Sequence, residues 1–183
     1  MFVVSNGVET RYIAANKNGE MNEKFLSRWV DEKNEPVDDY LGFAKDVLNI
    51  PAAHLMIGNY SVIDQEKRKL ILLRPYQIHA IDKIKEASRK QESGFVWHTT
   101  GSGKTLTSYT VTKNLLDIPA IDKTIFLIDR KDLDQQTSND FQSYAENDDV
   151  DIEDTARTSV LEDKLLNDSR IAIVTTIQKF QNI

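Results

Sequence analysis

Short apolar runs alternate with amphipathic stretches in the second half of the chain. Continuous apolar runs, which predict strands buried on both faces, occupy residues 94–98, 123–129 and 170–175. Stretches with a helical period, which predict helices, occupy residues 105–111, 131–144 and 158–166. Because strands that alternate with helices build parallel sheets, we predict an α/β fold in this half.

The first half has a different pattern. Two short strands around Asn6-Gly7 predict a β-hairpin, and Pro75 fits the first turn of a helix that runs to about Lys90. Further helices are predicted over 36–49 and 52–60, and 69–74 reads as extended. The apolar positions at helical spacing are Val37, Tyr40, Leu41, Ala44, Val47 and Leu48 in the first of these helices, and Ile78, Ile81, Ile84 and Ala87 in the one after Pro75.

Composition excludes several classes of protein. The 183 residues are 40% hydrophobic and 28% charged, which suits one or two globular domains. The chain has no cysteine, so it has neither disulfides nor thiolate metal sites, and this usage fits a cytoplasmic protein. No apolar run approaches the ~20 residues of a membrane span, and no basic region precedes the first apolar residues, so we expect neither a membrane partner nor a signal peptide. A net charge of −6 argues against tight DNA binding by this chain alone.

The stretch Thr99–Thr105 carries the clearest chemistry. A predicted strand, a glycine-rich loop, Lys-Thr and a predicted helix are the parts of a phosphate-binding loop, or P-loop. The backbone of such a loop and the helix N-terminus face phosphate oxygens, the lysine reaches the β- and γ-phosphates, and the threonine hydroxyl ligates Mg²⁺. The residues assigned to ATP and Mg²⁺ here are Thr100, Gly101, Ser102, Gly103, Lys104 and Thr105, with Lys104 and Thr105 in the catalytic role and Thr105 as the metal ligand.

The P-loop pattern is satisfied only from Gly101 onward. His98 stands where the strict pattern has its first glycine. A flexible Gly/Ser linker is the alternative interpretation of this stretch.

Polar residues follow the other two predicted strands of the second half. Asp129-Arg130 comes after one strand and Thr175-Thr176 lies at the end of the next. Ligands of parallel α/β sheets bind outside the carboxyl ends of the strands, so we expect both pairs to share one edge with the P-loop. For the threonine pair, plain β-propensity is an alternative explanation.

Arg74 and Gln77 precede the P-loop. A glutamine amide presents a donor and an acceptor, which match the N6/N7 edge of adenine. We therefore assign Arg74 and Gln77 to the adenine end of the nucleotide, with a solvated glutamine on a helix as the alternative.

These segments together resemble a known family. Gln77 looks like the adenine-reading Q motif of superfamily 2 helicases, and residues 129–136 look like motif Ia. Thr175-Thr176-Ile177-Gln178 resembles a later motif that touches the sugar–phosphate backbone. With Trp97-His98 before the loop, and with residues 2–12 like the last strands of a nuclease domain, the chain resembles the R (HsdR) subunits of type I restriction enzymes.

The resemblance implies an organisation and a function. Residues 1–16 would end the nuclease domain, 17–69 would form a mostly helical connector, and 70–183 would begin a RecA-like motor domain. The whole subunit would use ATP and Mg²⁺ to translocate duplex DNA before cleavage, together with methylation (M) and specificity (S) subunits in the cytoplasm. The DNA contacts would come from Asp129, Arg130, Thr175, Thr176 and Gln178.

The chain also departs from the family pattern. The carboxylate–lysine cluster of the nuclease would precede Phe2, and the Asp-Glu motif of the motor would follow Ile183, so we expect a fragment that binds Mg-ATP weakly and hydrolyses little. The spacing of Glu162 and Lys164 matches that of the nuclease cluster but reads as a helix surface. The alternatives are another superfamily 2 motor, a docking module that uses residues 17–69, and a small P-loop kinase.

Overall fold

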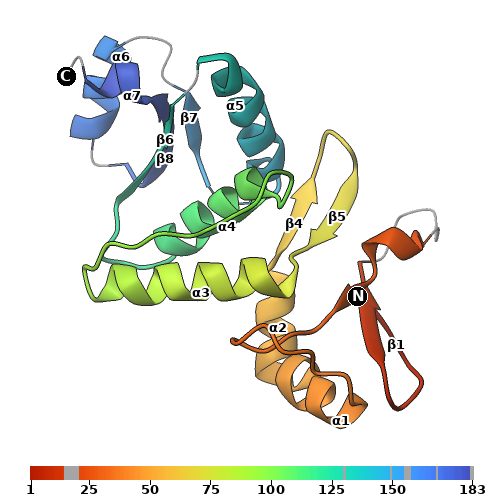
Figure 1. Ribbon diagram of the computed structural model, residues 1–183. Coiled ribbons are helices and arrows are strands. Elements are labelled where there is room, and N and C mark those ends of the chain that lie inside the picture. The colour runs from red at the N-terminus through yellow and green to blue at the C-terminus, as the bar shows by residue number, and fades with distance from the viewer. Residues whose placement is uncertain (15–20, 130, 149, 155–157, 168, 182–183) are drawn as a thin grey trace. The chain divides into compact units, whose positions relative to one another are not determined.

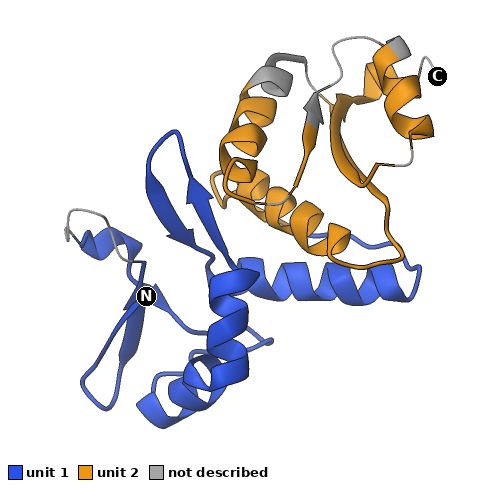
Figure 2. Cartoon of the chain, turned by 180° about the vertical axis from the view of Figure 1, so that it is seen from behind, with its two compact units in different colours: residues 1–96 blue, residues 97–183 orange. Residues whose placement is uncertain are grey.

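The computed structural model describes residues 1–14, 21–129, 131–148, 150–154, 158–167 and 169–181 (Figure 1). The chain forms two compact units, Met1–Val96 and Trp97–Ile183, which are described separately below (Figure 2). Gln77 lies in the first unit and the P-loop in the second.

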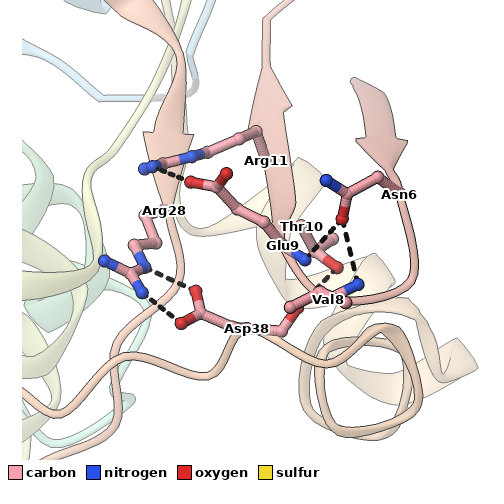
Figure 3. A network of polar contacts seen from close by, with 7 residues as sticks. All are labelled: Asn6, Val8, Glu9, Thr10, Arg11, Arg28 and Asp38. Atoms are coloured by element: carbon pink, nitrogen blue, oxygen red, sulfur yellow. Dashed lines mark hydrogen bonds and ion pairs between the residues drawn. The ribbon is translucent and has the colours of Figure 1, made fainter.

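The predicted N-terminal hairpin is confirmed. Strand β1 (Phe2–Ser5) pairs antiparallel with β2 (Thr10–Ile13), and β2 pairs with a short strand that the sequence did not predict, β3 (Ser27–Arg28). The Asn6 side-chain oxygen accepts hydrogen bonds from the backbone N–H groups of Val8 and Glu9, at 3.0 and 2.8 Å (Figure 3). Gly7 has φ +89°, which a residue without a Cβ adopts most readily.

An ion pair ties this sheet to the segment before the first helix. The Arg28 guanidinium donates to both carboxylate oxygens of Asp38, and the Thr10 hydroxyl donates to the Asp38 carbonyl at 2.9 Å (Figure 3). The hydrogen bonds from Arg28 hold the pKa of Asp38 below its ordinary value.

The helix predicted over 36–49 is shorter and irregular. It consists of α1 (Tyr40–Phe43) and a π-helical turn, η2 (Ala44–Leu48), which follow the 3₁₀ turn η1 (Glu23–Phe25) and precede α2 (Ile50–Gly58). Phe43 and Val47 are buried, but Tyr40, Leu41 and Leu48 are exposed, so the expected apolar face was wrong in part. A π turn has more residues per turn than an α-helix, and the 3.6-residue spacing therefore fails to identify the inward side chains.

The rest of the first unit follows the sequence more closely. Strand β4 (Ser61–Asp64), which the sequence did not predict, forms a hairpin with β5 (Lys69–Leu72), and α3 (Pro75–Arg89) begins at the expected proline. Ile78 and Ile81 are buried in α3 as predicted. The core of the unit also contains the aromatic rings of Tyr12, Trp29 and Phe43.

The second unit is the predicted parallel α/β arrangement. Its sheet has the order β6-β8-β7, and both pairings are parallel. In chain order the elements are α4 (Lys104–Leu116), β6 (Lys123–Ile128), α5 (Lys131–Ala145), β7 (Ile152–Asp154), α6 (Thr158–Leu166), β8 (Ile171–Thr176) and α7 (Ile177–Phe180).

The helices cover the two faces of this sheet unequally. Phe126 of β6 stacks on Phe141 of α5, with ring centroids 5.1 Å apart, which places α5 on one face. Ile173 of β8 points to the opposite face and packs with Leu161 of α6. Strand β8 is buried throughout, as predicted, but on the α6 face Ile125 and Leu127 of β6 are 40% and 43% exposed. The expectation that 123–129 is covered on both faces was therefore wrong, because α6 packs on β8 and leaves this face of β6 poorly covered.

The strand predicted over 94–98 does not form. This segment has no hydrogen-bonded strand neighbour among the described residues, and Phe95 and Trp97 are 102% and 96% exposed. An apolar run becomes a strand only where a neighbouring strand satisfies its backbone groups, so composition alone misassigned it.

Residues 146–154 contain six acidic side chains and no basic one, a composition that predicts a solvated loop, and this expectation is wrong in part. Its end forms β7, and the Asp148 carboxylate accepts hydrogen bonds from the Tyr109 hydroxyl at 2.6 Å and from the Lys113 ammonium at 2.7 Å. Burial and then the bond to Asp148 raise the pKa of Tyr109. One acid of the stretch thus anchors it to α4.

Candidate nucleotide-binding site

The loop before α4 has the backbone conformation that its glycines permit. Gly101 and Gly103 have φ +76° and +79°, in the left-handed region that residues with a Cβ rarely adopt. The helix follows at once, because the Thr107 N–H donates to the Gly103 carbonyl at 2.9 Å. This conformation agrees with a P-loop.

The N-terminus of α4 is suited to an anion. Gly103 occupies the cap position, and a glycine has no side chain that could accept a hydrogen bond from the first turn. The first N–H groups of a helix have no partner within the helix, and they carry partial positive charge. A phosphate at this end would receive hydrogen bonds from them.

Lys104 lies on the surface of the same loop. Its side chain is exposed, and its ammonium donates to the Thr99 carbonyl at 2.8 Å. The Ser102 hydroxyl donates to the same carbonyl, also at 2.8 Å. When a phosphate binds, Lys104 can donate to a charged phosphate oxygen in place of the neutral Thr99 carbonyl. The hydrogen bond between two charged groups is the stronger of the two.

His98 contacts the loop although it breaks the motif. Its Nδ1 lies 3.1 Å from the Ser102 hydroxyl oxygen. Partial burial, and secondly the nearby Lys104 ammonium, lower the pKa of His98 below its ordinary value. From the sequence, His98 was treated as a departure from the P-loop pattern and as part of the family resemblance, and its side chain was given no role in the loop. The signal it passed over was a side chain with two hydrogen-bonding atoms at a position where glycine is expected.

The two strand-end motifs of the second unit lie together. In the parallel pairing Ile128 stands beside Thr176, and the Gln178 side-chain N–H donates to the Asp129 carbonyl at 3.1 Å. Thr175 and Thr176 are both fully buried, and the Thr176 hydroxyl accepts from the Lys179 N–H at 3.3 Å as the cap of α7. Both threonines are thus buried in this structure, whereas Asp129 and Gln178 lie at the surface. Arg130 lies outside the described residues.

Gln77 has a local structural role in the first unit. Its side chain is 4% exposed, and its amide oxygen accepts from the Arg74 N–H at 2.9 Å, which closes the start of α3. Arg74 itself is exposed. The acceptor that adenine recognition would use is therefore engaged with the backbone in this structure.

Replacing Gln77 by alanine should lower the free energy of unfolding of the first unit by about 1 kcal/mol, because the helix start loses a buried cap. Urea denaturation would measure the change. Gln136→Ala is the matched control, since it makes the same change at an exposed position of α5 and should stay within about 0.5 kcal/mol of the unchanged chain. Equal stability of Gln77→Ala and the unchanged chain would contradict the capping role.

Other kinds of site find no support in the described ranges. No group of three or more His, Cys, Asp or Glu side chains there is placed to hold a metal ion. In the same ranges, no helix has the length and apolar character needed to cross a bilayer.

Comparison with known proteins identifies the family of the chain. Residues 76–183 match the SWI2/SNF2 ATPase family, and the match includes the P-loop and all three strands of the second unit. Over 180 residues, 98% of its length, the chain is 41% identical to the type I restriction enzyme SauCOLORF180P endonuclease subunit of Staphylococcus aureus (strain COL). It is 37% identical over 169 residues to a Mycoplasma pneumoniae protein described as the C-terminal part of the type I restriction enzyme MpnIIP endonuclease subunit. The latter match covers 85% of this chain and 80% of that protein.

The chain belongs to the family of type I restriction enzyme endonuclease subunits. Such subunits are enzymes with an ATPase-type region, and here that region contains the P-loop. The chain spans 19% of the length of the S. aureus endonuclease subunit. A shorter match, 33% identical over 85 residues, is to the type I restriction enzyme EcoprrI endonuclease subunit of Escherichia coli.

Proposed function

We propose that the second unit binds the phosphates of Mg-ATP as part of a RecA-like motor in a type I restriction endonuclease subunit. The observation that carries this proposal is the loop with two left-handed glycines, directly before α4, within the region matched by the SWI2/SNF2 ATPases. The loop backbone and Lys104 would hold the phosphates.

The residues present also fit Mg²⁺ in this role. Thr105 stands in the first turn of α4, half-buried and directly after Lys104. Mg²⁺ commonly takes few protein ligands and completes its shell with substrate phosphates and water, so a single hydroxyl is a sufficient donor from this loop. When bound, the ion would neutralise charge on the β- and γ-phosphates.

For the whole subunit, we propose that ATP hydrolysis moves duplex DNA before cleavage, in a cytoplasmic complex with methylation and specificity subunits. The family of the chain supports this proposal. In this chain, the surface around Asp129 and Gln178 is the proposed DNA contact, since it lies at the carboxyl ends of β6 and β8. Arg74 and Gln77 remain the proposed adenine contacts, for which Gln77 would have to exchange its bond to the Arg74 backbone.

The alternatives are less well supported. A P-loop kinase does not explain the 41% identity to an endonuclease subunit over 98% of the chain. A pure docking module does not explain why two glycines adopt left-handed backbone in front of an uncapped helix.

Binding of a fluorescent ATP analogue to this chain tests the proposal. We expect weak but saturable binding that requires Mg²⁺, is reversed by EDTA, and is competed by unlabelled ATP. A titration followed by fluorescence anisotropy would measure it. Absence of saturable binding in the presence of Mg²⁺ would contradict the proposed function of the loop.

A further inference from the structure

His98 is connected to the phosphate loop through Ser102 and Thr99. Its Nδ1 is 3.1 Å from the Ser102 hydroxyl oxygen, and that hydroxyl donates to the Thr99 carbonyl at 2.8 Å. The three residues therefore form a short chain of hydrogen bonds along the loop before Gly103.

The proton positions in this chain follow from its geometry. A serine hydroxyl has one proton, and the Thr99 carbonyl, which can only accept, lies closer to it at 2.8 Å than His98 Nδ1 at 3.1 Å, so we assign the proton to the bond with Thr99. The Ser102 oxygen must then accept from His98, so the His98 ring carries its proton on Nδ1. His79 provides the opposite case, because its Nε2 lies 2.9 Å from the Val30 carbonyl, which can only accept.

The Thr99 carbonyl receives three donors in this structure. They are the Ser102 N–H at 3.3 Å, the Ser102 hydroxyl at 2.8 Å and the Lys104 ammonium at 2.8 Å. When Lys104 moves to a phosphate, the two donors of Ser102 still satisfy the two lone pairs of the carbonyl. The carbonyl then stays directed at Ser102, and its negative end does not turn toward the phosphate.

We infer that His98 is a positioning residue for nucleotide binding: its Nδ1–H fixes the Ser102 hydroxyl, which holds the Thr99 carbonyl when Lys104 engages phosphate. This inference rests on the proposed function of the loop. It gives a role to the side chain that replaces the first glycine of the P-loop pattern. Because the pKa of His98 is lowered, its ring is neutral near pH 7 and carries a single proton, which the hydrogen bond to Ser102 places on Nδ1.

Affinity measurements on loop variants test the inference. His98→Ala and Ser102→Ala should each weaken binding of the Mg²⁺-bound fluorescent ATP analogue by about 3- to 10-fold, the size of one lost hydrogen bond. The double variant should bind no worse than whichever single variant has the lower affinity, because the two substitutions remove the same contact. His98→Asn should restore most of the affinity, since its side-chain amide also donates. His54→Ala, on the exposed surface of α2, is the matched control and should bind normally.

The ring proton can be located without nucleotide. Nitrogen-15 shifts of the three histidine rings should show His98 with its proton on Nδ1 and His79 with its proton on Nε2, and His98→Asn would assign the His98 signals. An Nε2–H form of His98 would overturn the inference.

The outcomes separate this inference from the proposed function. If the unchanged chain bound no nucleotide, both would fail. If it bound nucleotide and Lys104→Ala weakened binding while His98→Ala and Ser102→Ala bound normally, only the role of His98 would fail. Additive losses in the double variant, or no rescue by His98→Asn, would also overturn it, because a general loss of loop structure predicts those results.

Discussion

Replacing Phe141 by alanine should lower the free energy of unfolding of the second unit by about 3–5 kcal/mol. Phe141 is fully buried between the sheet and α4, where its ring stacks on Phe126 and meets the edge of Tyr109 at a centroid distance of 5.6 Å. Truncation removes the apolar contacts and leaves a cavity that flanking helices fill only in part. Urea denaturation, with hydrogen exchange of the β8 amides to report on this unit, would measure the loss.

Phe95→Ala is the matched control for this prediction. The same atoms are removed from a ring that is 102% exposed, so the change should stay within about 0.5 kcal/mol. A loss of several kcal/mol at Phe95 would mean that residues 94–98 form the buried strand that the sequence suggested. Equal small losses at both positions would contradict the described packing of α5 on the sheet.

Local patterns predicted most of the second unit. The apolar run of β8 is buried on both faces, and helices α5 and α6 lie within a residue of their expected ends. These elements could be predicted because their own residues determine them. A continuous apolar run forms a strand that is buried on both faces, and apolar residues with a 3.6-residue period form a helix that buries one face. The sequence placed glycines at positions 101 and 103, and the structure gives both of them a left-handed backbone.

The incorrect predictions share one physical cause: each of these segments depends on residues that are distant in the sequence. Residues 94–98 have the composition of a strand but no strand beside them in the described chain, and β6 has one poorly covered face because α6 packs on β8. Asp148 was assigned to solvent because nothing in its sequence surroundings reveals that Tyr109 and Lys113 lie beside it. Local pattern carries no information about such long-range partners.

The site was predictable in its chemistry but not in its connections. The order of the residues predicted a P-loop, and the segments after β6 and β8 meet through Gln178 and Asp129, as the expected shared edge suggested. The burial of Thr175 follows from the apolar run predicted over 170–175, but the burial of Thr176 was not foreseen, since a threonine of high β-propensity and one that contacts a nucleic-acid backbone look alike in sequence. The bond from His98 to Ser102 was missed because the motif specifies glycine at that position.

Replacing Lys104 by alanine should weaken binding of the Mg²⁺-bound ATP analogue by about 10- to 100-fold, which corresponds to the ~1.5–3 kcal/mol of a hydrogen bond to a charged group. The ammonium is the charged side chain of the loop that can follow the β- and γ-phosphates, and α4 contributes only partial charge at its N-terminus. Stability should change little, because the side chain is exposed and its bond in the free loop is to a carbonyl that Ser102 also satisfies. Fluorescence anisotropy would measure the affinity, and urea denaturation the stability.

Lys164→Ala is the matched control, because it removes the same charge from α6, on the opposite face of the sheet from α5. It should leave the affinity unchanged, which separates a local phosphate contact from a general effect of net charge. Equal weakening by both variants would indicate nonspecific attraction of an anionic ligand, and normal binding by Lys104→Ala would exclude the loop as the phosphate site. If only Lys104→Ala loses affinity and its stability is unchanged, nucleotide binding is assigned to the N-terminus of α4. The folded variant would then differ from the unchanged chain only in the side chain of Lys104.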